Sequence, residues 1–161
     1  MLAYVFWHQP RVGVARADYE RRLRAFHTAL SARSASFRLD ALPFGAGDGY
    51  EDWYLVEDWA DLGALNAAAV SAGRRASHDS VAGIAGEGWG GVYAPIRGAG
   101  EPPSTTRWLN KPGGESYDAF LDSVRAPTVW QRQMLLGPAP EFCLVESGGL
   151  SEVTVRTPIH P

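Results

Sequence analysis

Residues 6–10 read Phe6-Trp7-His8-Gln9-Pro10, and residues 108–112 repeat this pattern as Trp108-Leu109-Asn110-Lys111-Pro112. Aligning the two prolines pairs Phe6 with Trp108 and His8 with Asn110. Later landmarks then also fall opposite each other, Tyr19 with Tyr117 and Leu23 with Leu121. An internal repeat of this kind predicts a fold built from two similar units. Because the histidine stands in only one copy, the first unit is the candidate for a chemical role.

The first 98 residues show the pattern of a βαββαβ unit. Residues 2–8 alternate and are rich in aromatic and β-branched side chains, which predicts a strand. An amphipathic helix is expected from residue 18, because apolar side chains recur at helical spacing from Tyr19 to Leu30. Further strands are predicted at 36–42, 53–57 and 91–96, helices at 61–69 and about 75–85, and a glycine-rich turn at 86–91.

The rest of the chain repeats the pattern in a shorter form, after a Pro- and Gly-rich linker at 99–104. Strands are expected at 105–110, 129–136, 142–146 and 153–157 and a helix at 116–124, whereas 147–152 is too short for a second crossover helix. We therefore predict an α+β fold of two tandem ferredoxin-like units with antiparallel sheets, packed as a pseudo-dimeric α+β barrel. The first unit comprises residues 1–98 and the truncated second unit residues 105–161. The uncovered sheet of the second unit should pack on the first, giving a monomer that imitates a dimer, or on a second chain, giving a homodimer.

The composition is that of a soluble globular protein, with 45% hydrophobic and 20% charged residues in a chain of 161. A formal net charge of -3 gives no attraction to phosphate backbones, so nucleic acid is not an expected partner. No apolar run approaches the roughly 18 residues that span a bilayer, so we expect no membrane partner and a cytoplasmic location. Cys143 is the only cysteine, which excludes an internal disulfide.

His8 and His78 are the candidate catalytic residues. His8 falls at the end of the first strand, where it could act as a general base near neutral pH or be a buried imidazole bonded to the backbone. His78 lies on the helical segment 75–85 and could be a base, a haem ligand, a substrate clamp or an ordinary surface residue. We expect His27 to be an ordinary flank of its helix and His160 to be solvated. No metal site is predicted, because no HxH, HxxxH or HExxH spacing occurs.

Aromatic residues are numerous, with six tryptophans, six tyrosines and six phenylalanines. They either fill the core and the interface between the units or line a pocket for a flat apolar ligand such as a polyketide, a flavonoid or a porphyrin. We assign Trp7, Tyr54 and Asn110 as the side chains that would hold such a substrate.

Two tandem βαββαβ units with an aromatic first strand and a broken second crossover that ends in a histidine resemble the dimeric α+β barrel superfamily. This superfamily includes antibiotic-biosynthesis-type monooxygenases, haem-degrading monooxygenases, EthD-like proteins and related cyclases. The layout from Tyr54-Leu55-Val56-Glu57-Asp58-Trp59 to Ser77-His78-Asp79 is similar to the strand, helix and histidine of the haem-degrading branch. His78 matches that histidine, and His8 or Asn110 stands where an asparagine is expected. Residues 64–66 do not supply the helix tryptophan of that branch.

The resemblance implies a small-molecule enzyme, either a cofactor-independent monooxygenase or a cyclase, that acts on an aromatic or polyketide-like compound. In such an oxygenase the deprotonated substrate itself activates oxygen, with His8 or His78 as the base. Two alternatives stay open. One is a non-catalytic binding module for an apolar aromatic ligand, and the other is a haem-binding protein with His78 as the axial ligand. Apart from haem in this last case, no cofactor is expected.

Overall fold

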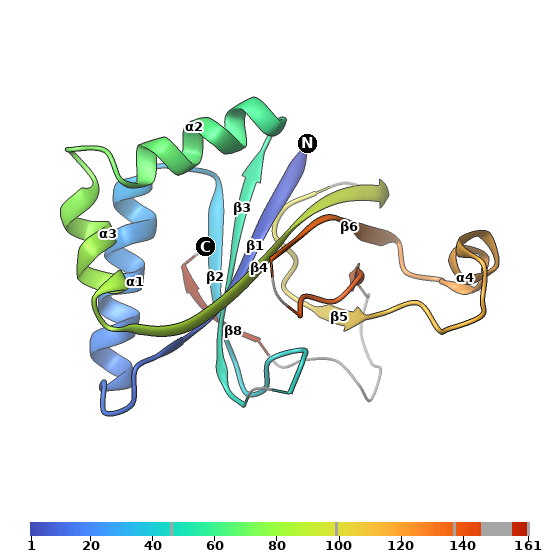
Figure 1. Cartoon of the computed structure of the whole chain (residues 1–161), viewed down its shortest axis with the longest axis horizontal. Coiled ribbons are helices and arrows are strands. Elements are labelled where there is room, and N and C mark those ends of the chain that lie inside the picture. The colour runs from blue at the N-terminus through green and yellow to red at the C-terminus, as the bar shows by residue number, and fades with distance from the viewer. Residues whose placement is uncertain (46, 99, 137, 146–155, 161) are drawn as a thin grey trace.

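The chain forms an α+β structure in which one antiparallel sheet curls on itself (Figure 1). The computed structural model describes residues 1–45, 47–98, 100–136, 138–145 and 156–160. In chain order, the elements within these residues are β1 (Leu2–Pro10), α1 (Arg16–Leu30), β2 (Ser34–Leu39), β3 (Gly49–Val56), α2 (Trp59–Ala69), α3 (Arg75–Ala82), β4 (Ala85–Arg97), β5 (Thr106–Leu109), α4 (Tyr117–Ser123), β6 (Thr128–Leu136), β7 (Phe142–Val145) and β8 (Arg156–His160).

The strands follow the order β5-β7-β6-β4-β1-β3-β2-β8, and every neighbouring pair is antiparallel. Strand β1 lies near the middle, paired with β3 from Leu2↔Val56 to His8↔Tyr50 and with β4 on its other side. Helices α1, α2 and α3 lie together on one side of β1 to β4, whereas α4 lies at the other end of the molecule (Figure 1). The predicted α+β class is thus confirmed as an eight-stranded curled antiparallel sheet with helices.

The helices differ in how firmly they are packed. The stripe predicted for α1 is buried and includes Tyr19, Leu23 and Leu30. Helix α2 begins with the side chain of Asp58 accepting hydrogen bonds from two backbone N–H groups, but it has no buried residue. Across the described parts of the chain, none of the helices combines the length and the apolar character that a membrane crossing requires.

Tryptophans fill the face of the sheet that the curl encloses, which we call the inner face. Trp7 on β1 and Trp108 on β5 belong to strands that three others separate in the sheet, yet their ring centroids are 4.9 Å apart. Trp53 lies 5.8 Å from Trp108 and 5.6 Å from Trp130. The β5 edge of the sheet therefore contacts the middle strands β1 and β3 across the inner face, where burial of large aromatic side chains stabilises the fold.

A buried carboxylate, that of Glu51 on β3, lies within this aromatic cluster. Its Oε2 accepts hydrogen bonds from Trp7 Nε1 at 2.9 Å and Trp108 Nε1 at 2.8 Å, and its Oε1 accepts one from Trp53 Nε1 at 2.6 Å. The guanidinium of Arg156 on β8 forms an ion pair with Oε1. Both charged side chains are fully buried, so each compensates the charge of the other.

One region differs from the sequence-based expectation, and a second lies outside the described residues. Residues 86–91 belong to β4, so the prediction of a turn there is wrong. Pairing of β4 with β1 and β6 outweighs the weak strand preference of its glycines. Residues 147–152, where the second crossover helix is expected to be missing, and residues 153–155 of the predicted last strand lie outside the described residues. The described strand β8 starts at Arg156.

Replacing Glu51 by Gln removes the charge that compensates Arg156 and nearly preserves the size of the side chain. Because the guanidinium then stays buried without a counter-charge, we expect the free energy of unfolding to fall by about 3–5 kcal/mol, measured by urea denaturation. Glu87→Gln is the control, since Glu87 is exposed on β4, and it should change stability by less than about 0.5 kcal/mol. Equal losses in the two variants would show that the ion pair does not hold the sheet together.

Candidate functional site

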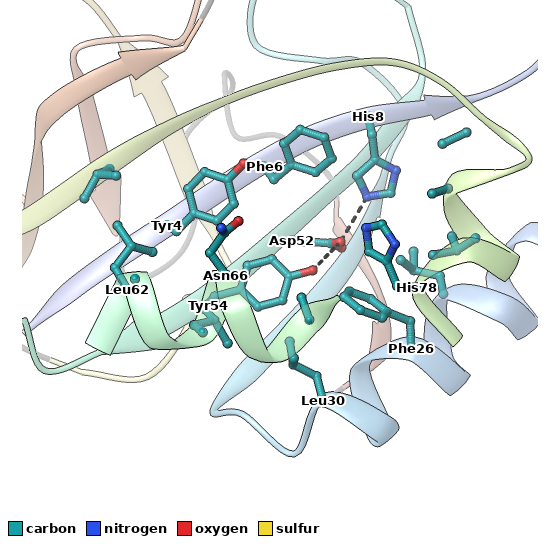
Figure 2. A pocket seen from close by; sticks show the side chains of 18 of the residues that line it. Tyr4, Phe6, His8, Phe26, Leu30, Asp52, Tyr54, Leu62, Asn66 and His78 are labelled. Carbon is teal, nitrogen blue, oxygen red and sulfur yellow. Dashed lines mark hydrogen bonds and ion pairs between the residues drawn. The ribbon is translucent and has the colours of Figure 1, made fainter. Parts of the chain in front are cut away.

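A cavity of about 810 Å³ lies between helices α1, α2 and α3 and the outer face of the sheet, which is the face opposite the tryptophan cluster (Figure 2). Its volume falls within the range of about 300–1,000 Å³ that is usual for small-molecule sites. Leu62, Leu65 and Asn66 of α2 line it from above the sheet. Helix α2 has no fully buried residue and contacts the core only through partly buried side chains, those of Leu65 and Ala69.

Four aromatic rings form a continuous floor in this cavity. The ring centroids of Tyr54 and Tyr4 are 6.0 Å apart, those of Tyr4 and Phe6 are 6.1 Å apart, and those of Phe6 and His8 are 5.3 Å apart. Successive ring planes differ by only 24°, 23° and 25°. The β1 members of the row are every second residue of the strand, which is why they share one face. The result is an extended surface of aligned rings that suits a flat aromatic molecule.

Two glycines of β4 make room for this floor. A Cβ atom on Gly88 would lie 2.4 Å from Phe6 Cζ, and one on Gly90 would lie 3.1 Å from Tyr4 Cε2. A larger residue at position 88 would therefore push the Phe6 ring out of the row. The glycine-rich segment shapes the cavity wall instead of turning the chain.

A buried hydrogen-bond network centred on Asp52 of β3 adjoins the floor (Figure 2). Its Oδ2 lies 3.1 Å from His8 Nε2 and 3.2 Å from His27 Nε2, and accepts a hydrogen bond from the Tyr54 hydroxyl at 3.1 Å. The Tyr19 hydroxyl lies 2.6 Å from His8 Nδ1. Both ring nitrogens of His8 therefore have protein partners, and only 3% of this residue is exposed.

The carboxyl group of Asp52 is ionised. Burial alone would raise its pKa, but the charges of His27 and His8 and their hydrogen bonds outweigh burial and hold the pKa well below its ordinary value. An ionised oxygen only accepts hydrogen bonds, so Nε2 of each imidazole carries the proton that faces Asp52. Burial and the nearby charge of Asp52 raise the pKa of Tyr19 and of Tyr54, which keeps both hydroxyls protonated near neutral pH.

His78 on α3 reaches the same cavity from the helical side (Figure 2). Its Nδ1 lies 2.9 Å from Asp79 Oδ1, and its ring packs against Phe26 with 5.9 Å between centroids. The side chain is 35% exposed, and Nε2 has no hydrogen bond to another described residue. His78 is thus an accessible imidazole whose first nitrogen is held by a carboxylate and whose second is available.

The structure brings three of the five predicted site residues to one cavity, namely His8, His78 and Tyr54. Trp7 does not line it, because neighbouring residues of a strand point to opposite faces, and Trp7 is fully buried on the inner face. Asn110 follows β5 in the second half and lies away from the cavity, where its Oδ1 accepts a hydrogen bond from a backbone N–H group.

Three residues of the network, Asp52, His27 and Tyr19, were not identified as site residues from the sequence, and Tyr19 was expected only as part of the apolar stripe of α1. The pair Glu51-Asp52 within a strand flanked by apolar residues was a usable signal, because it places one carboxylate on each face of the sheet. His27 is fully buried and continues the stripe of α1, so the expectation of an ordinary helix flank is wrong. His160 is half-buried and stacks on His27 with 5.2 Å between centroids, which differs from the expected solvated position.

These groups bond to one another, and nowhere in the described residues is a set of His, Cys, Asp and Glu side chains arranged to hold a metal ion. Comparisons of the chain with protein-family models, with curated proteins and with solved structures found no match. The function of the cavity is therefore inferred from the residues of this chain.

Proposed function

We propose that the chain is a small-molecule enzyme that binds a flat aromatic or polyketide-like compound in the cavity and removes a proton from it. The observation that carries this proposal is that one cavity combines a floor of aligned aromatic rings with an imidazole whose second nitrogen has no hydrogen-bond partner in the described parts of the chain. The rings supply stacking and apolar contact for a flat ligand. The imidazole supplies a proton acceptor.

We assign the base to His78 and a supporting role to His8. Asp79 holds the proton on His78 Nδ1, which leaves the lone pair of Nε2 for a substrate in the cavity. His8 has Asp52 on one nitrogen and Tyr19 on the other. It could take a substrate proton only if Tyr19 moved away or passed the proton on. His8 therefore serves to fix Asp52 and one end of the aromatic floor.

Transfer of a proton from a C–H or O–H group of the substrate to Nε2 leaves the electron pair on the substrate, as an enolate or a phenolate. In a monooxygenase this anion reacts with dioxygen. A methylene carbon becomes a carbonyl, one oxygen atom enters the product and the other leaves as water, so that the substrate loses the four electrons that dioxygen gains. In a cyclase the anion instead attacks a carbonyl carbon of the same molecule, and the resulting hydroxyl leaves as water without net oxidation.

The fold that we propose for this enzyme is a duplicated ferredoxin-like unit closed into a barrel-like sheet. Strands β4-β1-β3-β2 give the order expected of one unit, and β5-β7-β6 give the corresponding part of a second. The exchange between them is reciprocal, because β4 pairs with β6, the second strand of the other unit, while β8 pairs with β2. Contacts across the inner face support a monomer that imitates a dimer.

The internal repeat supports this interpretation if its two copies are aligned on their tryptophans, which shifts the alignment by one residue from that on the prolines. Trp7 and Trp108 both point to the inner face and touch each other. If they are equivalent, His8 corresponds to Leu109. The alignment on the two prolines paired His8 with Asn110 instead. The counterpart of His8 is then an apolar residue, and apolar side chains fill the outer face among the described residues of the second half.

A non-catalytic carrier of apolar aromatic ligands is the second candidate. It is favoured by the placement of α2, which lines the cavity but has no buried residue, so the helix could move to admit a ligand and then enclose it. It is also favoured by the exposure of Asp79, whose side chain is 63% exposed and therefore a weakly held partner for His78.

Haem fits the cavity less well. His78 could serve as an axial ligand, but haem carries two carboxylates, and Arg11 is the only arginine or lysine among the described residues that line the cavity. The buried carboxylate of Asp52 would add repulsion. We therefore derive no step that involves haem.

His78→Gln removes the proton acceptor and keeps a polar side chain of similar length. With an anthrone or hydroxyquinone substrate we expect oxygen uptake or ring closure to fall by about 10²–10⁴-fold, the usual contribution of a general base. Ser77→Ala lies on the same helix, outside the cavity lining, and should retain the wild-type rate. Thermal unfolding of both variants checks that the fold is intact.

His8→Gln and Tyr19→Phe separate the two candidate bases. If His78 is the base, Tyr19→Phe should reduce the rate less than His78→Gln does. Full turnover in His78→Gln together with its loss in His8→Gln would transfer the role to His8. Saturable quenching of tryptophan fluorescence by these compounds, without turnover by the wild type, would instead support the carrier.

Titration with haemin tests the third possibility. Because the cavity supplies one basic side chain for two propionates, we expect the visible spectrum of added haemin to show no Soret shift with the wild-type protein. A Soret shift that His78→Ala abolishes would contradict this expectation and identify His78 as an axial ligand.

A further inference from the structure

One oxygen of Asp52 has no partner, and this asymmetry bears on which ligand the cavity accepts. Oδ2 takes all three donors of the network, those of His8, His27 and Tyr54. Oδ1 is buried and has no hydrogen-bond partner among the described residues. A carboxylate can accept on both oxygens, and a buried oxygen left without a donor is destabilising.

The unpartnered oxygen belongs to a residue that lines the cavity. Asp52 is 2% exposed and lies next to the aromatic floor. Three donors fix Oδ2, so Oδ1 is the acceptor of Asp52 that remains for a ligand in the cavity, and a ligand reaches it when the side chains that cover it shift. A ligand that places a hydrogen-bond donor at this point satisfies the carboxylate, whereas a ligand without one leaves it unsatisfied.

Charge favours a neutral donor over a cationic one. The charges of His27 and His8 hold the pKa of Asp52 well below its ordinary value and keep this carboxylate ionised. An ammonium group at Oδ1 would therefore meet nearby positive charge, and an anionic ligand would meet the carboxylate. A hydroxyl group avoids both repulsions.

We propose that Oδ1 of Asp52 recognises a neutral hydroxyl group, that of a phenol or an enol, on the flat aromatic ligand of this cavity. The aromatic body lies on the rings of Tyr4 and Phe6, and the hydroxyl donates to Asp52. This inference rests on the proposed function only in sharing its cavity and its ligand shape, because it applies to a carrier as well as to an enzyme.

Three naphthalene probes with the same rings test this recognition by isothermal titration calorimetry. 2-Naphthol carries a hydroxyl donor, 2-methoxynaphthalene carries no donor, and 2-naphthylmethylammonium carries a cation. We expect 2-naphthol to bind at least about tenfold more tightly than 2-methoxynaphthalene, as for a hydrogen bond to a charged acceptor. Equal affinity of these two probes would overturn the proposal. Tightest binding of the ammonium probe would overturn it in favour of a cation site.

Asp52→Asn supplies a sharper test, because it exchanges an acceptor for a donor. The three donors hold the amide oxygen at the place of Oδ2, so the amide NH₂ group takes the place of Oδ1. The preference for 2-naphthol should then disappear or reverse, and an unchanged preference would contradict the assignment. Asp61→Asn, an exposed change on α2 outside the cavity lining, should leave the preference intact. If Asp52→Asn does not fold, the comparison of probes on the wild type decides.

The two proposals fail in different ways. A preference for 2-naphthol without turnover of anthrone or hydroxyquinone substrates would remove the enzymatic assignment and leave the recognition by Asp52 standing. Turnover of these substrates with equal affinity for 2-naphthol and 2-methoxynaphthalene would remove the recognition by Asp52 alone.

Discussion

The ion pair between Glu51 and Arg156 is the interaction on which the rest of the structure depends. Strands β5 and β8 are the two edges of the sheet and do not pair with each other in the described residues. The curl is therefore held by side chains and not by a closed ladder. Glu51 gathers indole N–H groups from β1, β3 and β5 and the guanidinium from β8, so it ties both edges to the middle of the sheet. Because the tryptophans donate their indole N–H groups to this carboxylate, the hydrogen bonds also fix the orientation of their rings.

The next residue along β3 carries the second buried carboxylate, on the opposite face of the same strand. Glu51 is compensated by a guanidinium, which stays protonated at any ordinary pH, so it is suited to a permanent structural contact. Asp52 is instead bonded to two imidazoles and a tyrosine hydroxyl, side chains that can take part in proton transfer. Two adjacent acids thus have different chemistry because the two faces of the sheet offer them different partners. The helical face, and not the tryptophan-filled face, is where proton transfer is feasible.

Periodicity in the sequence predicted the α+β class and most of the elements, since alternating strands and the stripe of α1 depend on local spacing. It also indicated His8, His78 and Tyr54, which line one cavity. It did not indicate which face of β1 forms that cavity, and Trp7 was assigned to the site although it points the other way. The strand at 86–91 was missed because its glycines are poor strand formers in isolation and are held only by pairing with distant segments. Such contacts leave no local signal.

In the described part of the second half, helix α4 packs directly on the outer face of the sheet. There Leu109 and Leu144 pack under α4, and Phe120 of this helix lies 4.8 Å from Phe142 between ring centroids. Helix α4 contributes a buried residue to this core, whereas α2 over the cavity contributes none. An open cavity forgoes the contacts that a filled core would make. The filled half and the aromatic inner face offset this loss, so the first half can keep an unfilled space and a buried acid within one small domain.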